Sequence, residues 1–234
     1  MAERFSNPVS RAIPAVDAGL RRYMLGVYNY MAAALGITGL VAFFVSTNAA
    51  LMQTLFTTGL MWVVLLAPLA LVFYLSFRFQ SLSFSTARNL LWLYAALVGL
   101  SLAPIFIVYT SESIARVFFI SGGTFAGMSI YGYATKRDLT GLGSFLIMGL
   151  WGLILAMIVN LFVQSTPFGL ALSAIGVLIF VGLTAYDTQR IKEFYYGGDS
   201  AEIAGKKSVF GALMLYLDFL NIFLNLLRLM GDRR

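Results

Sequence analysis

The last apolar stretch of the chain reads Val209-Phe-Gly-Ala-Leu-Met-Leu-Tyr-Leu-Asp218-Phe-Leu-Asn-Ile-Phe-Leu-Asn-Leu-Leu-Arg-Leu-Met-Gly231. It is long enough to cross a bilayer, because a spanning helix needs about 20 mostly apolar residues. A charged side chain near the middle of such a helix costs about 2.5–3.5 kcal/mol on insertion scales, so it normally faces a partner or a water-filled cavity. Asp218 therefore predicts a helix that lies inside a bundle.

The polar residues of this stretch share one face of the helix. At about 100° per residue, Asn221, Asn225 and Arg228 all lie within about 80° of Asp218. Leu, Ile and Phe cover the rest of the surface. We expect this polar stripe to face the other helices, with the two asparagines forming hydrogen bonds between helices and not acting as ligands.

Composition identifies an integral membrane protein. Of the 234 residues, 60% are hydrophobic and 11% are charged, and the mean hydropathy is +0.85. We expect an all-α, polytopic bundle of seven transmembrane helices with the last helix central: a tail at 1–22, then one transmembrane domain at 23–231. The seven apolar stretches lie at about 24–46, 57–78, 89–110, 114–134, 142–163, 168–189 and 209–230.

The positive charges predict the orientation. If seven helices alternate, 12 of the 16 Lys and Arg residues fall on one side, which places the N-terminus in the cytoplasm. The basic C-terminal tail then lies outside, unless the last segment is re-entrant, and both alternatives stay open. The net charge of +6 is interpreted as a topology signal with some attraction to anionic lipid, and not as a nucleic-acid site.

The chain contains no Cys and no His. This excludes disulfides, thiolate metal sites, the usual zinc sites, a histidine base and a histidine pH switch. We expect no enzymatic activity and no cofactor apart from bound calcium. Titration near neutral pH must then come from carboxylates.

Asp187, near the end of the sixth apolar stretch, is the expected partner of Asp218. Two carboxylates held close in a low-dielectric site cannot easily both be ionised, so the pair can share a proton. Arg78 ends the second stretch at the depth of Asp187 and could pair with it, and calcium prefers such oxygen ligands. Protons, Arg78 and a cation would thus compete for one pair. The alternatives are that Asp187 caps a helix end and that Asp218 makes a structural hydrogen bond.

A glycine-rich segment lies in the fourth apolar stretch. Gly123 and Gly127 have the small-xxx-small spacing that lets two helix backbones approach closely. We interpret this segment as an interior packing helix, with a pore lining as the alternative.

The last two apolar stretches resemble the signature of the Bax inhibitor-1 family, in Gly182-Leu-Thr-Ala-Tyr-Asp-Thr-Gln189 and in Leu215–Arg228. The resemblance runs from about Tyr23 to Gly231. Three further stretches support it: Phe119-Ile-Ser-Gly-Gly-Thr-Phe-Ala-Gly-Met-Ser, Lys136-Arg-Asp-Leu and Ile158-Val-Asn-Leu-Phe.

The resemblance implies a seven-helix bundle in the bacterial cytoplasmic membrane. In bacterial members of the family, a di-aspartyl pair on the sixth and seventh helices acts as a pH sensor for calcium leak, and Asp187 and Asp218 match it. An arginine on the second helix latches the pair; Arg78 is the match and Arg88 the alternative. Eukaryotic members suppress cell death, and another bacterial branch modulates a membrane protease.

Three functions remain open on the sequence. The first is a pH-sensitive leak channel for calcium or other cations, gated by Asp187, Asp218 and Arg78. The second is a non-conducting regulator that binds another membrane protein, such as a protease. The third, an intramembrane hydrolase, is disfavoured because neither Asp187 nor Asp218 follows the glycine that intramembrane aspartyl proteases carry.

Overall fold

The computed structural model describes the backbone of residues 9–234 and the side chains of residues 18–79 and 81–234. Within this range the chain forms helices and no sheet; one isolated bridge joins Tyr109 to Arg233. The helices are α1 (Val9–Ser46), α2 (Ala49–Thr57), α3 (Leu60–Arg78), η1 (Phe79–Ser81), α4 (Phe84–Leu102), α5 (Ile105–Val108), α6 (Ser111–Ala134), α7 (Thr140–Val163), α8 (Thr166–Glu193) and α9 (Ala201–Met230).

The seven predicted spans are confirmed. Among the described residues, seven segments are long and apolar enough to cross a membrane. They are Ala18–Ser46, Leu60–Arg78, Phe84–Val108, Ser111–Ala134, Thr140–Val163, Thr166–Glu193 and Ala201–Met230. The expected boundary after residue 22 is not a break in the backbone, because α1 runs unbroken from Val9. The remainder of the expected tail, residues 1–8, lies outside the described residues.

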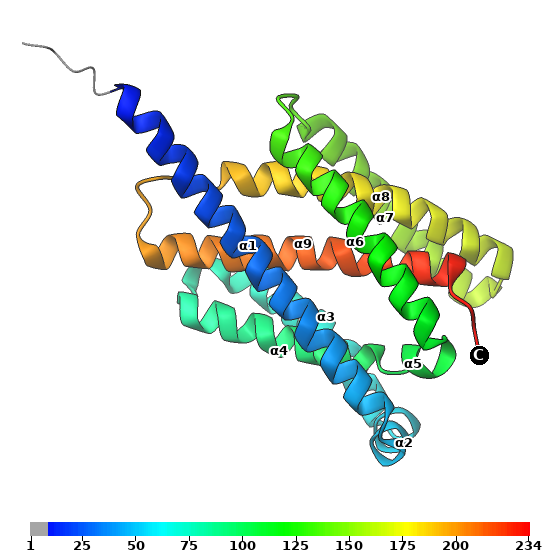
Figure 1. Ribbon diagram of the computed structural model, residues 1–234. Coiled ribbons are helices and arrows are strands. Elements are labelled where there is room, and N and C mark those ends of the chain that lie inside the picture. Colours follow the sequence, from blue (N-terminus) through cyan, green and yellow to red (C-terminus); the bar gives the residue numbers. More distant parts are fainter. Residues whose placement is uncertain (1–8) are drawn as a thin grey trace, which may run out of the picture.

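The central position of the last helix is also confirmed. In Figure 1, α1 crosses over α9, and α8 runs beside α9. Helices α4 and α6 also pack against α9. In the most apolar part of α9, 67% of the residues are buried, whereas the corresponding share is at most 44% in any other span. Tyr216 in the middle of α9 is fully buried and its hydroxyl lies 2.7 Å from that of Thr38 on α1. This helix is the core of the bundle.

The two ends of α9 lie at opposite ends of the bundle (Figure 1). α9 is one continuous helix of 30 residues, with no internal break at which the last segment could turn back. The tail after it docks on the start of α6. Asp232 forms an ion pair of 2.8 Å with Arg116, and its carbonyl accepts a hydrogen bond of 3.1 Å from the Thr110 N–H.

The predicted packing role of Gly123 and Gly127 is wrong within this chain. Both lie on the exposed side of α6, where an added Cβ would meet no atom within 4 Å. The close approach of α6 to α8 occurs instead at Gly132, where a Cβ would collide with the backbone of Ala185. Small-residue spacing thus marked the right helix and the wrong face of it.

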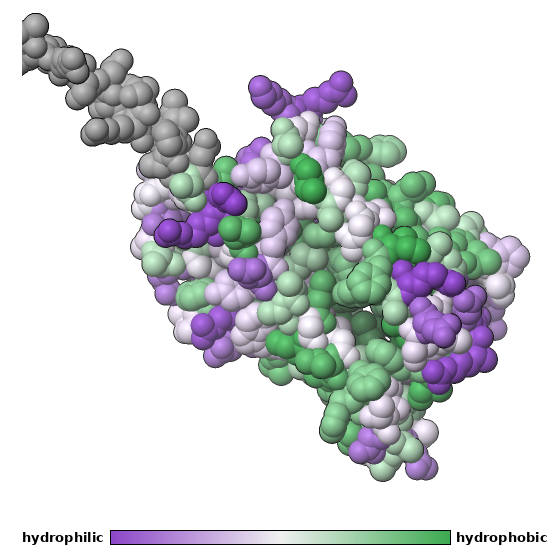
Figure 2. All heavy atoms as spheres, in the orientation of Figure 1, coloured by the Kyte–Doolittle hydropathy of each residue, from purple (hydrophilic) through white to green (hydrophobic). Residues whose placement is uncertain are grey.

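The outer surface is apolar, as lipid contact requires. Figure 2 shows one face of the molecule, with hydrophobic residues over its middle and hydrophilic residues gathered toward the ends of the bundle. Large exposed side chains on α7 include Trp151 and Phe162. A soluble protein rarely exposes so much contiguous apolar surface.

Candidate functional site

Asp187 and Asp218 meet where α8 packs on α9. Their side chains lie within hydrogen-bonding distance of each other. Asp218 is only 4% exposed, and its Oδ2 has no hydrogen-bond partner among the described residues. A buried polar atom without a partner is rare, because it forfeits its bonds with water. The predicted meeting of the two acids is therefore present, in a buried position.

The pair lines a cavity of about 460 Å³ between α7, α8 and α9. Besides the two acids, its polar lining consists of Arg190 and Asn221. The side of the cavity formed by α7 is entirely apolar: Ile147, Leu150, Leu153, Ile154 and Met157. Such a wall strengthens charge interactions inside the cavity, because it cannot solvate an ion.

The basic residue that lines the cavity beside the pair is Arg190, and not Arg78. Its guanidinium packs over the Phe194 ring at 5.6 Å and forms no ion pair with either acid among the described residues. Arg190 follows Asp187 by three residues, so both lie on one face of α8 and both line the cavity. Arg78 is exposed at the end of α3, a helix that packs on α4 and α2, and it does not line this cavity. The expected pairing of Arg78 with Asp187 is thus not present in this structure. The alternative residue, Arg88, packs over the Phe84 ring at 5.6 Å.

The polar stripe of α9 faces α7 and α8 as expected, but its asparagines do not bond between helices. Asn221 donates to the Leu217 carbonyl and Asn225 to the Asn221 carbonyl, each over 2.8 Å. The prediction of interhelical bonds is wrong because the carbonyl one turn earlier is the nearest acceptor. Asn225 instead packs its amide against Gly176 of α8, where no side chain intervenes.

The last member of the stripe, Arg228, lines a second cavity of about 580 Å³ near the C-terminal end of α9. Ile154 and Met157 line both cavities, so the two are neighbours along α7. Between them on α9 stands the contact of Asn225 with Gly176. The stripe therefore connects two separate polar sites.

The acidic pair is not a complete metal cage. Within the described residues, no group of three or more Asp, Glu, His or Cys side chains is placed to hold a metal ion. Calcium takes 6–8 oxygen ligands, so two carboxylates and one asparagine amide fall short of a tight site.

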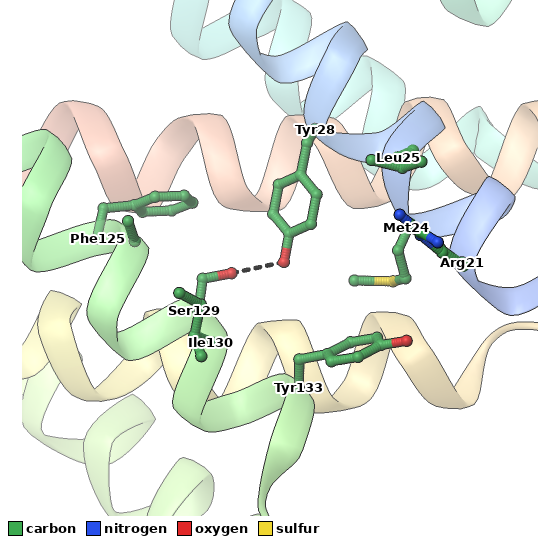
Figure 3. Close-up of a pocket in the computed structure, with 9 residues that line it drawn as sticks. Arg21, Met24, Leu25, Tyr28, Phe125, Ser129, Ile130 and Tyr133 are labelled. Atoms are coloured by element: carbon green, nitrogen blue, oxygen red, sulfur yellow. Dashed lines mark hydrogen bonds between the residues drawn. The ribbon is translucent and has the colours of Figure 1, made fainter. Parts of the chain in front are cut away.

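A hydrogen-bonded chain of hydroxyl groups links α1, α6 and α8, and the sequence interpretation missed it. Tyr28 of α1 lies above Ser129 of α6 (Figure 3), and both residues line a groove of about 410 Å³. The two hydroxyl oxygens are 2.7 Å apart, and Ser129 lies 3.0 Å from the hydroxyl of Thr188. On α8 the chain ends where the Thr188 hydroxyl donates to the Thr184 carbonyl over 2.7 Å. The sequence places Thr188 directly after Asp187, but it does not show the link of Thr188 to α6.

Comparison with known proteins identifies the family. A family model described as an inhibitor of apoptosis-promoting Bax1 matches residues 20–234. The chain belongs to the Bax inhibitor-1 family. The match includes both acids of the pair, so the resemblance seen in the last two helices is confirmed over the whole bundle.

Relatives of similar length include named and unnamed bacterial proteins. The chain is 46% identical over 230 residues to the inner membrane protein YbhL of Escherichia coli, which covers 97% of this chain and 98% of YbhL. It is 48% identical over 218 residues to an uncharacterised protein of Rickettsia prowazekii, covering 93% and 92%. This Bax inhibitor-1 protein is therefore an integral membrane protein with close bacterial relatives.

Proposed function

We propose that this Bax inhibitor-1 protein is a pH-sensitive leak channel for calcium and other cations, in a bacterial cytoplasmic membrane with its N-terminus in the cytoplasm. Asp187 and Asp218 form the gate. The name of the relative YbhL supports the inner membrane. The orientation rests on the distribution of Lys and Arg.

One observation carries the proposal: the carboxyl group of Asp218 is buried beside Asp187 and faces a cavity wide enough for water. Intramembrane carboxylates in such positions mark ion or proton pathways. A pair that serves packing alone would have both carboxyl groups fully hydrogen-bonded.

The gate depends on whether the pair holds a proton. When the two carboxyl groups share one, they hold α8 and α9 together through a hydrogen bond. When both are ionised they repel each other and attract a cation. Arg190 is the other titratable side chain that faces the cavity from α8; α7 contributes apolar side chains, and α9 adds the amide of Asn221. The pair therefore supplies the pH response.

Calcium influx into proteoliposomes across pH 5 to 8 tests the proposal, with wild type beside Asp218→Asn. We expect a pH-dependent flux in the wild type that the substitution abolishes or flattens. No flux at any pH, or an unchanged pH profile in Asp218→Asn, contradicts the gate. Thermal unfolding of both proteins in detergent shows whether the variant is folded.

Arg190→Gln and Arg78→Gln separate the two candidate latches. Because Arg190 lines the cavity, its loss should shift the pH at which flux is half-maximal. Arg78→Gln should leave the pH profile unchanged if the closed state is the one described here. A shift in Arg78→Gln alone would instead show a second state in which α3 moves to the pair.

The alternative function, a non-conducting regulator of another membrane protein, makes the opposite prediction. The purified protein would carry no calcium at any pH, and a stable partner would copurify with it. Gly123 and Gly127 lie on an exposed face of α6 that could contact such a partner. Substitution of either glycine with leucine should then release the partner.

A further inference from the structure

The second cavity along α9 has the opposite charge character to the first. It lies between the end of α7, the start of α8 and the end of α9, and it encloses about 580 Å³. Its polar lining comprises Asn160, Gln164, Ser165, Thr166, Arg228 and Arg233. No carboxylate among the described residues lines it.

Two guanidinium groups with no acidic partner line this cavity. Among the described residues, neither Arg228 nor Arg233 forms an ion pair. The neighbouring acid, Asp232, is held away from them by its 2.8 Å ion pair with Arg116. Arg233 packs over the Tyr109 ring at 5.9 Å, which orients its side chain without neutralising it. The arrangement keeps two positive charges available.

The opposite side of the cavity supplies further donors. Asn160 accepts the Ser165 N–H through Oδ1 at 3.2 Å, so the loop is held by the carbonyl side of its amide. The amide nitrogen of Asn160 makes no hydrogen bond within the described part of the chain and is free to donate. Ser165 caps α8, whose N-terminus adds partial positive charge.

We propose that this cavity binds a phosphate-bearing anion, with Arg228 and Arg233 as its clamp. Guanidinium groups form paired, charge-assisted hydrogen bonds to phosphate oxygens. The rim of the cavity is apolar and exposed, with Leu161 71% and Leu170 39% accessible. The phosphate can therefore belong to a lipid headgroup whose chains lie on this rim, or to free phosphate. The site does not depend on cation conduction.

Calorimetric titration of the protein in an uncharged maltoside detergent tests the proposal. The probes are dihexanoyl phosphatidylglycerol and inorganic phosphate, titrated separately. Phosphatidylglycerol binding alone identifies a lipid headgroup as the ligand; binding of both, in competition, identifies the phosphate group itself. Inorganic phosphate binding alone identifies free phosphate. Binding of neither probe to the wild type overturns the proposal.

The variants locate the site. Arg228→Gln and Arg233→Gln should each weaken binding by about tenfold, the usual effect of losing one charge-assisted hydrogen bond. Arg228→Lys keeps the charge and should recover part of the loss. Arg234→Gln is the matched control, because it removes one charge from the same tail but does not line the cavity.

Equal weakening in Arg234→Gln and Arg228→Gln overturns the proposal, because it would mean that net charge and not the cavity binds the probe. Melting temperatures of all the variants in the same detergent show whether each one is folded. Unchanged affinity in a folded Arg228→Gln, Arg233→Gln double variant also overturns it.

Discussion

The cavity that holds Asp187 and Asp218 and the cavity beneath Arg228 lie along the same face of α9, but one is acidic and the other basic. They share two residues of α7, Ile154 and Met157. On α9 the contact of Asn225 with Gly176 stands between them. One amphipathic helix can therefore serve two sites of opposite charge, provided that its neighbours divide its polar face.

The difference between the two cavities follows from their depth. The acidic pair is buried between α8 and α9, where an unpartnered charge is expensive. A proton shared by the two carboxyl groups would relieve that cost. Arg228 in the last turn of α9 and Arg233 in the tail after it are exposed, so water can solvate them and they keep their charge without an acidic partner. A titratable site and a permanently charged site thus result from position.

The largest expected effect concerns the acidic cavity. Asp187→Asn and Asp218→Asn should each reduce the pH response of calcium flux from about tenfold across pH 5 to 8 to within about twofold. The double variant should behave like either single variant, because the two groups titrate as one unit. Liposome flux measures this, and additive effects would mean that the acids act separately.

The contact of Asn225 with Gly176, which stands between the two cavities, can be tested by measuring the stability of a variant protein. Gly176→Val forces a side chain into the amide of Asn225 and should lower the free energy of unfolding by about 1–3 kcal/mol. Gly123→Val is the control, since a Cβ there meets open space, and it should change stability by no more than about 0.5 kcal/mol. Equal melting temperatures for the two variants in detergent would contradict the described packing.

A charge reversal tests whether the cavities form one route. Arg228→Glu should raise cation flux by about threefold at low salt, because a negative charge concentrates cations at the entrance. High salt should remove the gain by screening. Arg234→Glu makes the same charge change outside the cavity and should have little effect. An unchanged cation flux in Arg228→Glu would mean that cations do not pass the basic cavity.

The smallest effect is expected at an acid remote from both cavities. Asp138, in the loop between α6 and α7, is fully exposed and accepts hydrogen bonds from Thr140, which lower the pKa of its carboxyl group. A carboxyl group with a lowered pKa stays ionised from pH 5 to 8, so it cannot contribute to a pH response there. Asp138→Asn should reproduce the wild-type flux profile. A flattened pH profile in this variant would mean that the pH response is not specific to the buried pair.

Much of the site could be predicted from residue spacing. The interior position of Asp218 follows from the cost of exposing a carboxylate to lipid, and its meeting with Asp187 follows from both lying in the last two spans. Arg190 could have been found as well, because three residues separate it from Asp187 on one helix. That Arg190 and not Arg78 lines the cavity could not be predicted, because the position of Arg78 depends on how α3 packs against α4 and α2.

By itself the sequence determined the seven spans, the burial of the last helix and the pairing of its acid. These properties follow from hydropathy and periodicity, which act over short segments. Only the tertiary structure decided that Gly132 and Gly176, and not Gly123 and Gly127, meet a neighbouring helix, and that α9 borders two cavities. Which face of a membrane helix packs is set by the shapes of residues distant in the chain, because lipid and protein interiors are similarly apolar.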